Sequence, residues 1–365
     1  MFPLKCSSIY KMPEKYEPPD DLVDDTNYPN LNSRDYAKRP LNHTTQMHDA
    51  WECLSINSPD TEVEGNIVIG CNKLNGREWI GSLWGFEKYD VVKNKTLGGS
   101  NKASFKLQCE SLITGMEFVT KNILLLALNT GKVQLWSTHS EVRNAKNPYC
   151  LFLIGERCEH MEPITSTSTF RTNESKALTA CKRGTVKIWD MGSADLFLEK
   201  SFQFAHSDVI TGLAASLTND YIFLTCSLDK SCLIWDDREI RPALALYEKH
   251  DVRFKDVCWS PENNDCIIYA GDECGYILTI DKRSPKKYLD KSKYFDRPIR
   301  KIRPHHDNLA VIADTNIVKV SKIPNHATCY ENSDSQHFTR DCSWLSSTEL
   351  LTVGFDGKLR FHNIE

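Results

Sequence analysis

One short phrase recurs along the chain: a turn, then an alternating strand that ends in an aromatic residue and often in Asp. Its clearest copy is Arg183-Gly-Thr-Val-Lys-Ile-Trp189-Asp190. Four strong copies and three fainter ones can be aligned, and the aligned column consists of Trp84, Trp136, Trp189, Trp235, Ile280, Val320 and His362. Self-similarity of this kind indicates a fold built from repeated units.

The spacing of the copies defines the architecture. The steps along the aligned column are 52, 53, 46, 45, 40 and 42 residues. They bracket the roughly 40–45-residue period of WD repeats, with insertions in the first two steps. Two strand-like runs precede the strong copies and a fourth strand is implied after each, so we predict an all-β fold, a seven-bladed WD-repeat β-propeller. A β-sandwich does not repeat at this period.

Closure of the ring involves both ends of the sequence. The chain stops at Glu365, directly after the third strand of the seventh unit. We therefore predict that residues 36–46 on the N-terminal side supply the missing outer strand, so that the propeller spans 36–365. Residues 1–35 contain five prolines and an acidic run, 14–25, with six acidic residues against one Lys. We expect this arm to be disordered or draped over the surface.

Composition excludes several classes of protein. With 45 Lys and Arg against 49 Asp and Glu, the net charge of -4 does not favour nucleic acid or an anionic membrane as a partner of the whole molecule. No apolar run approaches the roughly 20 residues that span a bilayer. Residues 1–13 do not have the pattern of a secretory signal, so we expect a cytoplasmic protein, with the nucleus left open as a second location. The 14 cysteines form no C-x-x-C pair, and we expect neither disulfides nor zinc.

Patterns that carry chemistry are missing from the sequence. There is no Gly-rich phosphate loop, no nucleophile elbow and no metal-spaced cluster. We therefore expect no enzyme, no catalytic residue and no cofactor. The fourth unit does contain His206, Ser227, Asp229 and Trp235, which superficially resemble a hydrolase triad. We interpret them as a hydrogen-bonded structural network inside the blade.

The first candidate interaction site is the hairpin of the first unit, residues 73–84. By alignment on the repeat, Trp79 occupies the turn position that holds Gly in units 2, 3, 5 and 7, and Arg77 lies beside it. Trp79 either folds back against a neighbouring blade or anchors in a pocket of a partner, because Trp and Arg dominate interface hot spots. Asn75 and Glu78 complete the candidate partner-binding set.

Residues 282–303 form a basic run, with ten Lys and Arg against two Asp and with aromatic residues interleaved. The run is interpreted either as a solvated blade edge or as a local surface for RNA or an acidic partner. The candidate residues for such a surface are Lys286, Lys287, Lys291, Lys293, Arg297 and Arg300.

A further motif is Trp235-Asp236-Asp237-Arg238. A W-D-x-R turn occurs in propellers that dock onto the adaptor of cullin-based ubiquitin ligases. The same four residues also cap ordinary WD blades. A ligase substrate receptor therefore stays open as an alternative function, and an RNA-binding propeller is a third.

At the first hairpin the sequence resembles a known family. The stretch Ile69-Gly-Cys-Asn-Lys-Leu-Asn-Gly-Arg77-Glu-Trp79-Ile-Gly-Ser-Leu-Trp84 is similar to the first blade of the methylosome WD-repeat subunit, the obligate partner of the type II protein arginine methyltransferase. Residues 223–238, 271–273 and 340–344 are similar to later blades in the same order. The resemblance covers all seven units, with a weak sixth, and includes the G-R-x-W hairpin tip.

The resemblance implies a function and an assembly. Arg77 and Trp79 would insert into the N-terminal TIM-barrel domain of the methyltransferase, and four methyltransferase chains would join four propellers in a hetero-octamer. The chain would be a non-catalytic scaffold that supports symmetric arginine dimethylation of Sm proteins and histones without binding the methyl donor itself. The acidic arm 1–35 and the basic run 282–303 depart from the family pattern.

Overall fold

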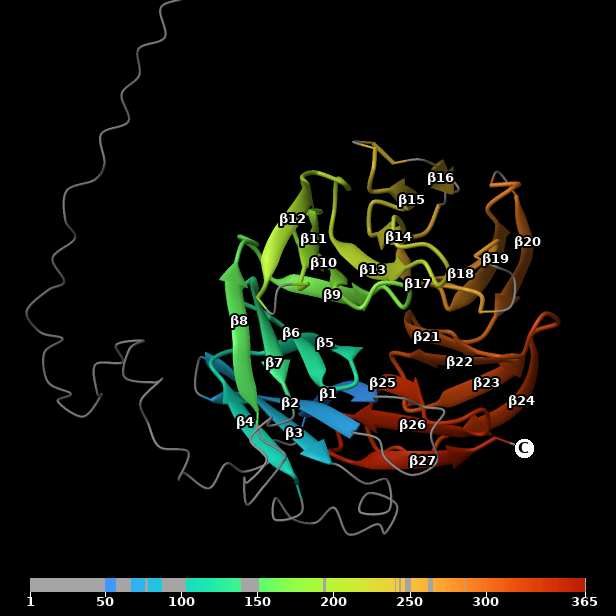
Figure 1. Cartoon of the computed structure of the whole chain (residues 1–365). Coiled ribbons are helices and arrows are strands. Elements are labelled where there is room, and N and C mark those ends of the chain that lie inside the picture. Colours follow the sequence, from blue (N-terminus) through green and yellow to red (C-terminus); the bar gives the residue numbers. More distant parts are fainter. Residues whose placement is uncertain are drawn as a thin grey trace, which may run out of the picture. The chain divides into compact units, whose positions relative to one another are not determined.

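The computed structural model describes residues 50–56, 67–75, 78–86, 103–138, 151–192, 195–239, 241–242, 244–246, 251–261, 265–285 and 287–364. Within these ranges 27 strands form seven antiparallel sheets, which we call blades 1 to 7 in chain order (Figure 1).

The strands of the first three blades follow one another along the chain. Blade 1 consists of β1 (Ala50–Ile56), β2 (Ile67–Asn75), β3 (Glu78–Phe86) and β4 (Phe105–Cys109). Blade 2 consists of β5 (Ile113–Thr120), β6 (Ile123–Leu128), β7 (Lys132–Ser137) and β8 (Phe152–Cys158). Blade 3 consists of β9 (Ile164–Thr169), β10 (Lys176–Cys181), β11 (Val186–Asp190) and β12 (Phe197–Phe202).

The remaining blades continue the pattern. Blade 4 consists of β13 (Ile210–Ala215), β14 (Ile222–Ser227), β15 (Cys232–Asp236) and β16 (Leu244–Leu246). Blade 5 consists of β17 (Phe254–Trp259), β18 (Ile267–Asp272), β19 (Tyr276–Asp281) and β20 (Tyr288–Lys293). Blade 6 consists of β21 (Ile299–His305), β22 (Asn308–Ala313), β23 (Val318–Lys322) and β24 (Ala327–Asn332). Blade 7 consists of β25 (Thr339–Trp344), β26 (Glu349–Gly354) and β27 (Leu359–Asn363).

The blades form a closed ring. The inner strands are β1, β5, β9, β13, β17, β21 and β25; each contacts the next, and β25 contacts β1. Every residue of the aligned column, from Trp84 to His362, lies in the third strand of its blade. The prediction of a seven-bladed β-propeller is confirmed. In the described part of the chain blade 7 has three strands; residues 36–46 and the arm 1–35 lie outside that part, so the closing strand and the domain boundary stay predictions.

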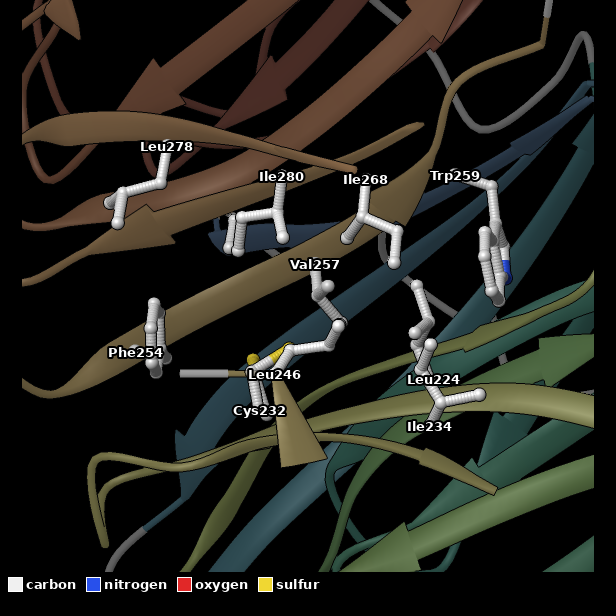
Figure 2. Close-up of a cluster of buried hydrophobic side chains, with 12 residues drawn as sticks. Leu224, Cys232, Ile234, Leu246, Phe254, Val257, Trp259, Ile268, Leu278 and Ile280 are labelled. Carbon is white, nitrogen blue, oxygen red and sulfur yellow. The ribbon is translucent and has the colours of Figure 1, made fainter. Parts of the chain in front are cut away.

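The core lies between neighbouring blades. Figure 2 shows one interface, in which Leu224 and Ile234 of blade 4 face Val257, Trp259 and Ile268 of blade 5. Since each sheet is covered on both faces, its central strands are apolar almost throughout, and all six residues of β22 are buried. The outer strand β20 is covered less, and five of its six residues are exposed.

Aspartates join adjacent blades by hydrogen bonds. The backbone N–H of Leu54 in blade 1 donates to Oδ2 of Asp341 in blade 7, over 2.9 Å. The backbone N–H of Ile302 in blade 6 donates to Oδ2 of Asp256 in blade 5, over 2.8 Å. Both carboxylates are buried, so each bond satisfies a backbone donor that has no access to water.

Each inner strand carries a β-bulge near its start, where the pairing with the second strand skips one residue. These seven residues, which we call the bulge ring, are Glu52, Thr114, Thr165, Thr211, Lys255, Arg300 and Arg340. A bulge leaves one residue outside the ladder and re-aims its side chain. All seven line a central cavity of about 980 Å³.

One face of the ring carries the turns between the second and third strands. In blades 2 to 5 these turns donate hydrogen bonds to the chain at the start of the inner strands, for example from Asn129 N–H to Leu112 O and from Leu228 N–H to Val209 O. The bulge ring follows directly after those starts, so it surrounds the mouth of the central cavity on the face that we call the hairpin face.

We expect Asp341→Ala to lower the free energy of unfolding by about 1–3 kcal/mol, because the buried N–H of Leu54 loses its acceptor. Asp341→Asn keeps an acceptor oxygen and should cost less. Urea denaturation of both variants checks this, with the exposed Asp251→Ala as the control. Equal stability of Asp341→Ala and Asp251→Ala would contradict the role of this link in ring closure.

Candidate functional site

The β2–β3 hairpin of blade 1 is longer than its counterparts. Its register runs through nine pairs, from Ile67 opposite Phe86 to Asn75 opposite Glu78. The corresponding pairing in each of the other six blades has five pairs. Three of the extra pairs lie beyond the Asn72–Gly81 pair, on the side of the turn, so blade 1 projects further on the hairpin face than the other blades do.

The base of this hairpin is fixed against blade 2 by Asn72. Its Nδ2 donates to Ile113 O and its Oδ1 accepts from Ile113 N–H, both over 2.9 Å. Nδ2 also donates to Oε2 of Glu52, over 2.9 Å. Opposite Asn72, a Cβ on Gly81 would come within 2.6 Å of Ser111 O, so only glycine permits this close approach. The projecting part therefore rises from a rigid base.

The backbone of three predicted partner-binding residues, Asn75, Glu78 and Trp79, lies at the projecting end. Arg77 lies outside the described residues, and so do the side chains of Asn75, Glu78 and Trp79. The backbone corrects one expectation: Trp79 does not occupy the turn position but lies within β3, opposite Leu74. Directly opposite residues share a face of a hairpin. Leu74 is 51% exposed, and this face of the hairpin is therefore open to a partner.

The glycines in the corresponding turns of four other blades explain why Trp79 does not lie in a turn. Gly131, Gly184, Gly275 and Gly357 all have positive φ, between 63° and 84°, in the corresponding turns. A bulky side chain is disfavoured in that region of backbone space. Blade 1 has no glycine there and instead continues its ladder to the tip.

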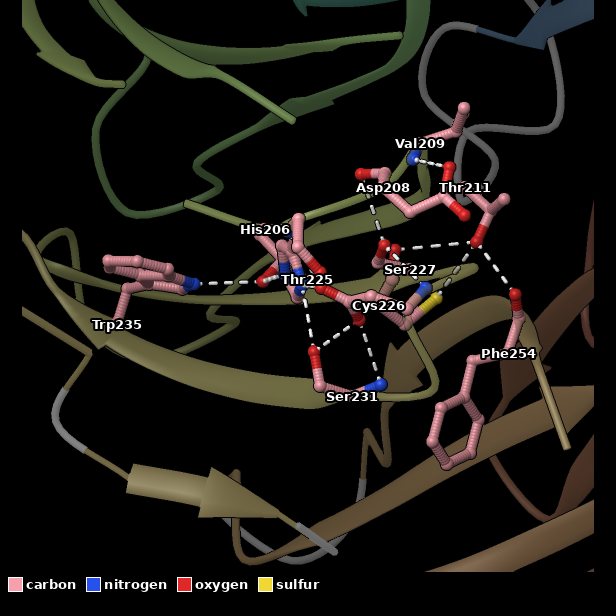
Figure 3. A network of polar contacts seen from close by, with 12 residues as sticks. His206, Asp208, Val209, Thr211, Thr225, Cys226, Ser227, Ser231, Trp235 and Phe254 are labelled. Carbon is pink, nitrogen blue, oxygen red and sulfur yellow. Dashed lines mark hydrogen bonds and ion pairs between the residues drawn. The ribbon is translucent and has the colours of Figure 1, made fainter. Parts of the chain in front are cut away.

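The polar set of blade 4 forms a buried network, as Figure 3 shows. Trp235 Nε1 donates to Thr225 Oγ1 over 2.8 Å, and Thr225 Oγ1 lies 2.6 Å from His206 Nε2. His206 Nδ1 lies 3.0 Å from Asp229 Oδ2. Because the carboxylate of Asp229 can only accept, we assign the ring proton to Nδ1, so that in the neutral ring Nε2 accepts from the Thr225 hydroxyl. Burial raises the pKa of Asp229, but hydrogen bonds from His206 and Ser231 outweigh it and hold that pKa well below its usual range.

Ser227 does not occupy the place that the sequence suggested. Its hydroxyl donates to Asp208 O and accepts from Asp229 N–H, while Thr225 bridges His206 and Trp235. Both nitrogens of His206 are engaged and its side chain is fully buried, so the cluster presents no nucleophile and base to a substrate. The geometry is that of a structural network.

A spacing in the sequence could have identified Thr225 as the bridging residue. It stands ten residues before the aligned aromatic residue, and the same spacing recurs in Thr179 and Trp189 of blade 3, whose Oγ1 and Nε1 are 2.8 Å apart. In blade 3, His160 Nε2 lies 2.7 Å from Thr179 Oγ1. Burial, and then the charge of Lys187, lower the pKa of His160 to about 3.

The basic run 282–303 does not form one surface. Lys291 and Lys293 lie on the outer strand β20, over the ring of Tyr276. Lys287 and Arg297 lie in the connections at the two ends of β20, and Arg300 lies on the inner strand β21. Lys286 is outside the described residues. The run therefore crosses from the rim to the central cavity.

The Trp235-Asp236-Asp237-Arg238 motif acts locally. Arg238 donates through Nε and Nη2 to both oxygens of Asp236, over 2.9 and 2.6 Å, while its side chain is 63% exposed. Asp237 is buried and pairs with Lys176 of blade 3. Blade 5 repeats the clamp between Arg283 and Asp281. The motif is thus explained as a turn clamp plus an inter-blade ion pair.

Among the described residues, no group of three or more His, Cys, Asp or Glu could hold a metal ion. No helix in the described part of the chain is long and apolar enough to cross a membrane.

Comparisons with known proteins agree with the fold. A family model described as "WD domain, G-beta repeat" matches residues 198–236, from β12 to β15. A chain of the COPII outer coat vertex superposes with a TM-score of 0.72 at 15% identity, over 86% of this chain and 84% of that one. The molecule is therefore a WD-repeat β-propeller.

Two relatives define the family. Protein valois of Drosophila melanogaster is 30% identical over 376 residues, covering 100% of both chains. Methylosome protein WDR77 of Xenopus laevis is 25% identical over 306 residues, covering 82% of this chain and 87% of that protein. The chain belongs to the family of Protein valois and the methylosome protein WDR77.

We expect Thr225→Val to lower the free energy of unfolding by about 1–3 kcal/mol, because Trp235 Nε1–H and His206 Nε2 lose their shared partner in the core. Chemical denaturation checks this. Thr172→Val, at an exposed bend, is the control. A Thr225→Val variant as stable as the wild type would contradict the bridging role.

The lowered pKa of His160 predicts a pH dependence of stability. The folded state resists protonation down to about pH 3, whereas the unfolded side chain takes up a proton near pH 6.5, so acid favours unfolding in that window. Between pH 6 and pH 5 this one histidine should cost about 1 kcal/mol. His160→Gln should flatten the pH profile in that range, as measured by urea denaturation; an unchanged slope would show that His160 does not cause it.

Proposed function

We propose that this chain is the non-catalytic scaffold subunit of a protein arginine methyltransferase complex. The observation that carries the proposal is the elongated blade 1 hairpin, which has Gly-Arg-Glu-Trp at its projecting end, in a chain that belongs to the family of the methylosome protein WDR77. The propeller holds the catalytic subunit in its competent assembly and helps to present Sm proteins and histones for symmetric dimethylation. Such a complex works in the cytoplasm, with the nucleus as a second location.

The hairpin has the properties of an anchor. Its base is locked by Asn72 and Gly81, so few degrees of freedom are lost on binding. The sequence at this hairpin contains Arg77 and Trp79, and Arg and Trp are the residue types that contribute most at interface centres. We propose that these two enter a pocket of the methyltransferase, with Asn75 and Glu78 as flanking contacts.

The assembly we propose contains four propellers and four methyltransferase chains. Size-exclusion chromatography with light scattering, on this chain mixed with its cognate type II arginine methyltransferase, tests partner and stoichiometry together. A single peak at the mass of four plus four chains is the expected result. Two separate peaks would overturn the proposed partner.

We expect Trp79→Ala to weaken binding to the methyltransferase by about 30- to 1,000-fold, which corresponds to roughly 2–4 kcal/mol for a central anchor. Isothermal titration calorimetry of the purified chains measures this. The matched control is Lys230→Ala, in the corresponding turn of blade 4 on the same face. Equal affinities of Trp79→Ala and wild type would remove the anchor role while leaving the partner itself unaffected.

A further inference from the structure

The bulge ring concentrates positive charge on one side of the cavity mouth. Three consecutive inner strands, β17, β21 and β25, carry Lys255, Arg300 and Arg340 at the bulge. The rest of the ring consists of three threonines and Glu52, whose Oε2 accepts the hydrogen bond from Asn72. The mouth is thus basic along one continuous arc, which we call the basic arc, and mostly neutral elsewhere.

Two of the three cations of the basic arc have no charged partner among the described residues, and the third is only partly satisfied. Lys255 and Arg300 make no ion pair and no hydrogen bond there. Nε of Arg340 is buried without a hydrogen-bond partner in the same ranges, and the nearest acid, Asp314, lies 3.8 Å from its Nη1. Burial, and then the charge of Arg300, lower the pKa of Arg340, as expected where two cations lie close together.

One step deeper in the cavity the charges are matched. Lys301 lies 4.0 Å from Asp256, and Arg303 lies 3.9 Å from Asp341. These two aspartates are the ones that hold neighbouring blades together. Fold stability therefore accounts for the deeper pairs, whereas nothing in the described structure accounts for Lys255 and Arg300 at the mouth.

We propose that the basic arc binds a carboxylate-rich peptide segment of another protein, which lies across the cavity mouth on the hairpin face. Lys255 and Arg340 stand on strands that have β21 between them, so a ligand that reaches all three cations is extended and carries successive negative charges. Thr211 borders the arc beside Lys255 and Glu52 borders it beside Arg340, so a segment with only a few carboxylates fits the arc. The three cations lie on β17, β21 and β25 and not on the blade 1 hairpin, and the proposal does not depend on the methyltransferase.

Nucleic acid fits this mouth less well. A phosphate backbone is bound along a longer track of basic groups than three side chains on one arc. The other cations that the sequence run suggested, Lys291 and Lys293, lie on the outer strand β20 and already contact Tyr276. They cannot extend the basic arc.

Fluorescence anisotropy with a fluorescein-labelled peptide of alternating Glu and Gly tests the proposal on the full chain at low salt. We expect saturable binding that Lys255→Ala and Arg300→Ala each weaken by about 5-fold, and the double variant by about 30-fold. The affinity should also fall as salt is raised. Arg340 is left intact because its guanidinium packs over Phe355, at 4.6 Å from the ring centre.

Two controls isolate the basic arc. Lys322→Ala removes an exposed charge at the end of β23, on the opposite face, and should bind like the wild type. A peptide with Gln in place of Glu should not bind. Matching thermal unfolding curves for all variants exclude a folding defect.

Three outcomes would overturn the proposal. They are an affinity for the Glu peptide that the double variant does not change, equal binding of the Gln peptide, and tighter binding of a labelled oligouridine that is lost in the same double variant. The last outcome would assign the basic arc to RNA.

Discussion

The burial of both faces of every sheet against its two neighbours is the constraint on which this structure depends. No blade covers itself, so the apolar central strands such as β22 are stable only when the ring is complete. The join between blades 7 and 1 has the same kind of core as the others, with Leu351 and Val353 packed against Ile67 and Ile69. The hydrogen bond from Leu54 to Asp341 adds direction to this packing, because it fixes the inner strands relative to each other.

A frame held in this way leaves its turns free to vary. In blades 2, 3, 5 and 7 the second-to-third-strand turn is closed by a glycine with positive φ. Blade 1 lacks that glycine, continues its ladder for three more pairs and so places Trp79 beyond the level of the other turns. The longer hairpin is supported at its base. Asn72 forms two hydrogen bonds with the backbone of Ile113, and the absence of a side chain at Gly81 allows close packing against Ser111. The base of the hairpin thus meets a structural need, and the same hairpin carries the residue proposed as the anchor.

The ring itself could be predicted from the sequence because its signal is local and repeated: the aligned column places one residue in each third strand. Features that depend on how the strands pair could not be predicted from the sequence. Alignment on the repeat assumed hairpins of equal length, which misplaced Trp79 in the turn. The sequence pattern predicted Ser227 as the hydroxyl of the His206 and Trp235 network, whereas the structure has Thr225 there. A threonine ten residues before the aligned tryptophan recurs in blade 3. The basic run appeared continuous because β20 and β21 follow each other in the chain, yet one is an outer strand and the other an inner strand.

At the bulges of the inner strands, neighbouring residues have different roles. In blades 5 and 7 the bulge residue is basic and the next residue is the aspartate that accepts a backbone N–H from the adjacent blade. A buried carboxylate needs a nearby cation, and Lys301 and Arg303 fill that need from β21. The bulge turns Lys255 and Arg340 away from those aspartates toward the mouth of the cavity. There Arg340 lies 3.8 Å from Asp314 of blade 6, whereas Lys255 has no charged partner among the described residues. Lys255 and Arg300 are therefore better explained by a ligand outside the chain than by the fold.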